Sequence, residues 1–195
     1  MDFNDAQSLC LEVNDAGFTA ELSHGQVVVV PWASPDSGKI LHRMQRALFP
    51  LANENDWVFF QSLAVHVPPH RDMRLPDLIV APEAAELYDG MHIFGHSTLL
   101  VVEVCSKGTA AVDYAEKPNE YARAGVPLYL IIDQLADPQR LVLMSGPVDD
   151  LAPQDCRPPY EKTITIHRGD KLVLPDPFNL TIETDELFTP GGSTR

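Results

Sequence analysis

The chain has 195 residues, with 14 lysines and arginines against 28 aspartates and glutamates, which gives a formal net charge of −14 at pH 7. Its length is sufficient for one sizeable hydrophobic core. The acidity argues against a protein that binds nucleic acid non-specifically through a basic surface, because such binding neutralises phosphates with lysine and arginine. The acidic net charge is still compatible with a basic cleft at one place on the surface.

Targeting and redox signals give further limits. The first residues contain no basic segment followed by an apolar core, and no stretch approaches the ~18 uninterrupted apolar residues of a membrane-spanning helix. The 3 cysteines are far apart and show no CxxC spacing. We therefore expect a cytoplasmic protein with no membrane segment, with reduced thiols and with no zinc site.

The N-terminal part is predicted to contain two helices separated by a β-hairpin. The first helix is short and is expected to end at Gly17. Residues 18–30 favour a hairpin with its turn at His24–Gly25. Residues 31–38 are rich in proline, serine and aspartate and predict a loop, whereas the apolar residues of 39–53 recur at helical spacing and predict an amphipathic helix.

Strands are expected to follow this helix. Residues 57–67 are rich in aromatic and β-branched side chains and predict one long strand, which Pro68–Pro69 would end. Residues 75–81 predict another strand, and the polar stretch 82–95 predicts a loop.

The stretch 99–133 is predicted to form the centre of the fold. It contains an apolar β-branched run at 99–104, a helical segment that ends at Gly125, and a second apolar run at 128–132. Two such runs on either side of a helix are typical of a parallel βαβ unit, because a parallel crossover needs about a dozen residues or more.

The C-terminal part is predicted to consist of short strands. Residues 140–144 form the first of them. Residues 160–167 alternate polar and apolar side chains and are expected to form a hairpin with 171–174. Residues 178–182 predict a last strand, and we expect 191–195 to be a flexible tail.

Three acidic residues are candidates for metal chemistry: Glu21, Asp77 and Glu103 each lie on or beside a predicted strand. Glu103 interrupts an otherwise apolar run, so its carboxylate needs partners, an open strand end or a metal ion. Mg²⁺ takes carboxylate oxygens together with water and substrate phosphate. The three acids therefore predict a metal site for phosphoryl chemistry, although purely structural roles for them remain the alternative.

Asp113, Lys117 and Tyr121 are spaced four apart and would share one face of a helix. Pro118 disfavours helical geometry at Lys117, which places this lysine at a helix break or at a fresh helix start. Two interpretations stay open. The lysine forms a solvated pair with Asp113, or it lies beside a metal-bound water or the scissile phosphate.

The segments that carry a resemblance to a known family are Glu21-Leu22, Pro76-Asp77, residues 102–106, Asp113, Lys117, Tyr121-Ala122, Gly125-Val126, residues 129–133 and residues 174–178. With them the chain resembles the Uma-two family of restriction endonucleases, which belongs to the PD-(D/E)XK nuclease superfamily. The resemblance covers nearly the whole chain.

This resemblance implies an α/β (α+β) fold with a restriction-endonuclease-like core, in which helices flank a central mixed β-sheet and β-hairpins are added at both ends. One domain would span residues 1–190. Asp77 and Glu103 would bind Mg²⁺ or Mn²⁺, and Glu21 would be an auxiliary acid. In the superfamily pattern a lysine stands two residues after the second acid, where this chain has Cys105.

Because a cysteine supplies no positive charge, the lysine has to come from elsewhere. Lys117 in the following helix is the choice that the resemblance implies, and Lys107 is its competitor. The expected function is a metal-dependent endonuclease that hydrolyses phosphodiester bonds of DNA, as a homodimer that cuts both strands. The alternative is a catalytically silent binding or regulatory module, which the net charge of −14 favours.

Overall fold

The computed structural model describes residues 3–30, 33–90, 92–148 and 156–188. The predicted tail 191–195 lies outside these residues. In chain order the elements are α1 (Phe3–Asp15), β1 (Thr19–Ser23), β2 (Gln26–Val30), α2 (Pro35–Glu54), β3 (Trp57–Phe60), β4 (Ala64–Val67), β5 (Asp72–Arg74), β6 (Leu78–Pro82), β7 (His92–Phe94), η1 (Gly95–Ser97), β8 (Leu100–Val104), α3 (Ala110–Ala115), α4 (Lys117–Arg123), β9 (Leu128–Asp133), β10 (Arg140–Pro147), β11 (Tyr160–His167), β12 (Lys171–Leu174), β13 (Leu180–Glu183) and α5 (Thr184–Phe188).

The strands form three sheets. A six-stranded sheet has the order β11-β10-β9-β8-β6-β3, a five-stranded sheet has the order β2-β1-β5-β4-β7, and β12 pairs with β13. Strands β8 and β9 are parallel, while the other pairs in the six-stranded sheet are antiparallel. The expected mixed α/β fold and its central βαβ unit are therefore confirmed.

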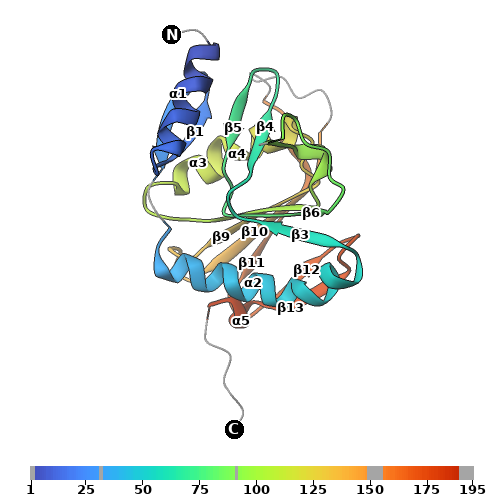
Figure 1. Ribbon diagram of the computed structural model, residues 1–195. Coiled ribbons are helices and arrows are strands. Elements are labelled where there is room, and N and C mark those ends of the chain that lie inside the picture. Colours follow the sequence, from blue (N-terminus) through green and yellow to red (C-terminus); the bar gives the residue numbers. More distant parts are fainter. Residues whose placement is uncertain (1–2, 31–32, 91, 149–155, 189–195) are drawn as a thin grey trace.

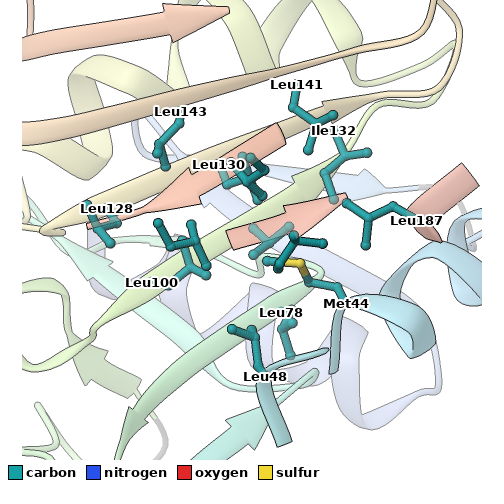
Figure 2. Close-up of a cluster of buried hydrophobic side chains, with 14 of the residues drawn as sticks. Met44, Leu48, Leu78, Leu100, Leu128, Leu130, Ile132, Leu141, Leu143 and Leu187 are labelled. Carbon is teal, nitrogen blue, oxygen red and sulfur yellow. The ribbon is translucent and has the colours of Figure 1, made fainter. Parts of the chain in front are cut away.

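The six-stranded sheet is covered on both faces (Figure 1). Helices α2 and α5 lie on one face together with β12 and β13, and α3, α4 and the five-stranded sheet lie on the other. Figure 2 shows Met44 and Leu48 of α2 and Leu187 of α5 beside leucines of the sheet, such as Leu100 and Leu130. Burial of these apolar side chains is the main force that holds the layers together.

Alternation along β8 decides which face its acid occupies. Val102 and Val104 belong to the cluster packed against α2, whereas Val101 and Cys105 belong to the cluster packed against α4. Successive side chains of a strand point to opposite faces. Glu103 therefore points toward α4, where charged partners are available.

The loop predicted for residues 31–38 is wrong in its second half, because α2 already begins at Pro35. Ser34 is the N-cap, and its hydroxyl accepts the backbone N–H of Ser37. Serine at the N-cap, proline in the first turn and Asp36 after it are the residues that favour a helix start. The serine, proline and aspartate that indicated a loop are therefore the residues that begin the helix.

The single strand predicted over residues 57–67 is also wrong. A bend at Gln61–Ser62 separates β3, which pairs with β6 in the six-stranded sheet, from β4, which pairs with β5 and β7 in the five-stranded sheet. Both parts have the same β-rich composition, so composition does not reveal the change of sheet. Strand β7 lies within the stretch predicted as a loop.

The prediction of a hairpin between residues 160–167 and 171–174 is wrong, because these two strands pair with other strands. β11 pairs with β10 along the edge of the six-stranded sheet, and β12 forms its hairpin with β13. The hydroxyl of Thr184 donates to the backbone carbonyls of Asp170, over 2.8 Å, and of His167, over 3.3 Å. These contacts hold the turn between β11 and β12, where the chain passes from one sheet to the other. A hairpin does lie at each end of the chain, since β1 pairs with β2 as predicted.

The crossover helix is divided. α3 and α4 meet at Glu116, so Lys117 begins a new helix with Pro118 in its first turn, as the sequence predicted. Among the residues that the structure describes, no helix is long and apolar enough to span a membrane.

Candidate active site

Asp77 and Glu103 are brought together by the pairing of β6 with β8. Leu78 lies opposite Val102 in this antiparallel pair, so Asp77, one residue before β6, comes next to Glu103. The carboxylate of Asp77 accepts the backbone N–H of Val104 over 2.7 Å. The two acids, 26 positions apart along the printed sequence, thus share one corner of the sheet.

Lys117 lies between two buried carboxylates. Its Nζ is 2.8 Å from Oε1 of Glu103 and 2.9 Å from Oδ1 of Asp113. The hydroxyl of Tyr121 donates to the same Oε1 of Glu103 over 2.7 Å. The start of α4 at Lys117 and the four-residue spacing to Tyr121 let both side chains reach one carboxylate. The predicted shared face of Asp113, Lys117 and Tyr121 is therefore present, and it is buried rather than solvated.

Asp113 is fully buried, and in the described part of the chain its carboxyl group has few polar partners, of which the Cys105 thiol is one. The ammonium of Lys117 is its counter-charge. The backbone carbonyl of Asp113 accepts the hydroxyl of Tyr129 over 3.0 Å, which fixes this turn of α3 independently of the side chain.

Glu21 lies in β1 and is held by Arg74. Its Oε2 is 2.8 Å from Nη1 of Arg74, and its Oε1 accepts the backbone N–H of Leu75 over 3.0 Å. Glu21 therefore fixes the backbone two residues before Asp77. Both of its oxygens have protein partners, which suits a supporting role better than direct contact with a cation.

Arg74 and Glu120 are functional candidates that the sequence analysis missed. The guanidinium of Arg74 forms two bonds to Glu120, of 2.6 and 3.0 Å, and a third to the hydroxyl of Ser23. Both charged residues are buried. A charge beside apolar neighbours, as in Met73-Arg74-Leu75, is the only local signal, and it does not identify a partner 46 residues away.

A second group of possible metal ligands consists of His24, Glu116 and Glu120. One ligand atom from each of these side chains lies within 4.8 Å of the others. Glu120 already binds Arg74, and Glu116 lies 3.5 Å from the same guanidinium. A cation at this point would be repelled by the arginine. We therefore assign this group to the support of Arg74.

A cavity of about 630 Å³ opens over the acids. Its lining includes Glu21, Asp77, Glu103, Lys117, Ser37 and His92. The first turn of α2, with Ser37, and the end of β8, with Glu103, thus both contribute to this lining. Lys107 is exposed in the turn after β8 and is not among the lining residues.

Burial dominates the electrostatics of the site. It raises the pKa of Asp77, against the effects of the Val104 N–H and of Lys117. It also raises the pKa of Glu103 well above the ordinary range, and the charges of Asp77 and Asp113 add to this shift, while Lys117 opposes it. Both carboxyls are thus poorly compensated, and a further positive charge would stabilise their ionised forms.

Burial alone would lower the pKa of Lys117, but the charges of Glu103, Glu21 and Asp113 outweigh it and raise this pKa above the ordinary value. Lys117 is therefore an ammonium at neutral pH. Cys105 occupies the position two residues after Glu103, and burial raises the pKa of its thiol. The thiol is neutral and does not replace a lysine.

Comparison with known proteins gives a family and a fold. The family model described as "Uma2: Putative restriction endonuclease" matches residues 4–191. The chain is also similar to a crystal structure described as a putative nuclease belonging to DUF820 from Anabaena variabilis, with a TM-score of 0.62 and 13% sequence identity over 88% of this chain and 90% of that chain. At this identity the similarity shows a shared fold. No curated protein matches the chain.

Proposed function

The chain belongs to the Uma2 family, whose model is described as "Putative restriction endonuclease", and from this premise we propose that it is a metal-dependent endonuclease that hydrolyses phosphodiester bonds of DNA. One observation carries the proposal. Asp77, Glu103 and Lys117 line the same cavity, although they come from three separate parts of the chain, and Lys117 contacts Glu103 directly. Paired carboxylates beside a lysine are suited to a phosphate and its metal ion.

The donor set fits Mg²⁺ or Mn²⁺. Asp77 and Glu103 offer carboxylate oxygens, which hard cations prefer, and their raised pKa values show that the present surroundings do not compensate their charges. These two residues would hold the ion. When bound, the ion would lower the pKa of a water ligand and neutralise charge on a phosphoryl oxygen.

The remaining residues have roles that follow from their contacts. The ammonium of Lys117 would donate to the phosphate as negative charge develops there in the transition state. Tyr121 would orient Glu103 through its hydroxyl. Glu21, held by Arg74, would keep the backbone before Asp77 in place. We choose Lys117 over Lys107 for the lysine role because only Lys117 contacts the acids.

A homodimer is part of this proposal, because two sites related by twofold symmetry suit the cutting of two strands. A catalytically silent binding or regulatory module is the second candidate, and the net charge of −14 favours it. Retention on DNA at low salt with EDTA present separates the two. An enzyme for duplex DNA is expected to be retained, and a module for other partners is expected to pass through at every salt concentration.

The direct test is the nicking and linearisation of supercoiled plasmid in Mg²⁺ and in Mn²⁺. We expect the wild type to cut and the variants Asp77→Asn, Glu103→Gln and Lys117→Met to lose cleavage. Asp36→Asn is the matched control, because Asp36 is an exposed carboxylate paired with a lysine at 2.8 Å. Circular dichroism would confirm that the variants fold. Unchanged cleavage by Glu103→Gln would rule out the assignment.

A further inference from the structure

The proposed function leaves one buried charge without a role. Asp113 is 0% exposed, and among the described residues its carboxyl group has few polar partners, namely the Lys117 ammonium and the Cys105 thiol. A buried carboxylate normally has several such partners. Its one close charged contact is the Lys117 ammonium, at 2.9 Å.

The fold does not need this carboxylate to place α3. The backbone carbonyl of Asp113 is already anchored by the hydroxyl of Tyr129, and its N–H donates to the carbonyl of Thr109. Asp113 is also not the single carboxyl partner of Lys117, because Oε1 of Glu103 lies 2.8 Å from the same Nζ. Without a metal ion, a second carboxylate beside Lys117 adds repulsion toward Glu103.

A divalent cation in the site would give the carboxylate of Asp113 a role in the balance of charge. The carboxyl groups of Glu103 and Asp113 lie 2.8 and 2.9 Å from one ammonium, and Asp77 is next to Glu103 in the paired strands. If all three carboxyl groups carry their charge, this single ammonium leaves two negative charges uncompensated. One divalent cation supplies the missing charge. The cation and the ammonium would compete for Glu103, because two positive charges repel one another at one carboxylate.

We infer that Asp113 is the positioning residue for Lys117, which it holds in the site after a divalent cation has engaged Glu103. This inference rests on the proposed metal site. The four-residue spacing from Asp113 to Lys117 spans the break between α3 and α4 and points both side chains inward. Asp113 acts through Lys117 and touches neither the metal nor the substrate.

The first test follows the ammonium itself and does not depend on DNA cleavage. In ¹H–¹⁵N spectra of lysine side chains, an ammonium held in an ion pair gives a persistent signal, which the loss of that signal in Lys117→Arg would assign. With saturating Mg²⁺ we expect this signal to persist in the wild type and in Asp113→Glu, and to disappear in Asp113→Asn. Its disappearance in the wild type would overturn the inference even if Asp113→Asn does not fold.

The second test separates positioning from ligation. Relative to the wild type, Asp113→Asn is expected to lose about 10- to 100-fold in kcat, which is typical of residues that orient a catalytic group. Its Mn²⁺ affinity and its KM for DNA should stay within about threefold, and Asp113→Glu should recover part of kcat. An unchanged kcat, or a loss of Mn²⁺ affinity as large as in Asp77→Asn, would overturn the inference.

The two tests also distinguish this inference from the proposed function. If the Lys117 signal of the Mg²⁺-bound protein persists in the wild type and disappears in Asp113→Asn, but the wild type cuts no DNA, the positioning role of Asp113 stands and the endonuclease assignment fails. If calorimetry detects no binding of Mg²⁺ or Mn²⁺ to the wild type, the metal site fails and the inference fails with it.

Discussion

Lys117→Met is expected to destabilise the protein, most strongly at alkaline pH. Lys117 is the counter-charge of two buried carboxylates, Glu103 at 2.8 Å and Asp113 at 2.9 Å. Methionine keeps most of the volume of the side chain and removes the ammonium. The matched control is Lys39→Met, because Lys39 forms a pair of similar length, 2.8 Å, with Asp36, and both of these side chains are largely exposed.

The magnitude follows from the burial of the pair. Removal of one partner from a buried ion pair costs about 3–5 kcal/mol. The carboxyls that remain can escape by taking up protons, at about 1.4 kcal/mol for each pH unit above their ordinary pKa. Burial already raises the pKa of Glu103 to about 8, and loss of the ammonium raises it further. The part of the penalty that comes from Glu103 is therefore fully present only above this raised pKa and becomes smaller as the pH falls. The exposed control pair contributes little, because water screens it.

Urea denaturation at pH 9 and at pH 6 measures both parts of this prediction. Lys117→Met should lose about 3–5 kcal/mol of unfolding free energy at pH 9 and less at pH 6, while Lys39→Met should match the wild type at both pH values. Equal effects of the two substitutions, or a loss that does not change with pH, would refute the reasoning about the buried cluster.

Three further predictions concern pH, packing and the arginine network. Because burial raises the pKa of Glu103, the carboxylate form that would bind the proposed metal ion is lost as the pH falls through that raised value. The proposed cleavage should therefore fall at a higher pH than for an ordinary carboxylate, and a pH–rate profile that is flat from pH 6 to 9 would contradict this. Gly95→Ala should lower the free energy of unfolding, measured by urea denaturation, by about 1–3 kcal/mol, because the added methyl group would overlap the carbonyl oxygen of Ala124. Gly38→Ala in α2 should raise the same free energy by about 0.5–1 kcal/mol, because its methyl group would meet no atom within 4 Å. Arg74→Met should cost about 3–5 kcal/mol in the same assay, since it leaves two buried carboxylates unpaired; a loss below that of Gly95→Ala would contradict the network.

The centre of the fold could be predicted from local patterns. The apolar run before Glu103 and the helical segment after it predicted the parallel βαβ unit, because these periodicities act within a few residues. Pro118 predicted the helix start at Lys117, since proline restricts the backbone on either side of it. The position of Glu103 on the α4 face follows from simple alternation along β8.

Long-range choices could not be predicted in the same way. The composition of residues 57–67 is the same in β3 and β4, and only tertiary pairing assigns these strands to different sheets. β11 also had two possible partners of similar pattern, and it pairs with β10. Arg74 and Glu120 meet across 46 residues, and no short motif records such a contact.

The measurement that tests the account most directly is a calorimetric titration of the protein with Mn²⁺ in the absence of DNA. The account predicts that the wild type and Asp36→Asn bind one ion with the same affinity, and that Asp77→Asn and Glu103→Gln each lose this binding. Full Mn²⁺ affinity in Glu103→Gln, or no binding by the wild type, would contradict a metal site at Asp77 and Glu103.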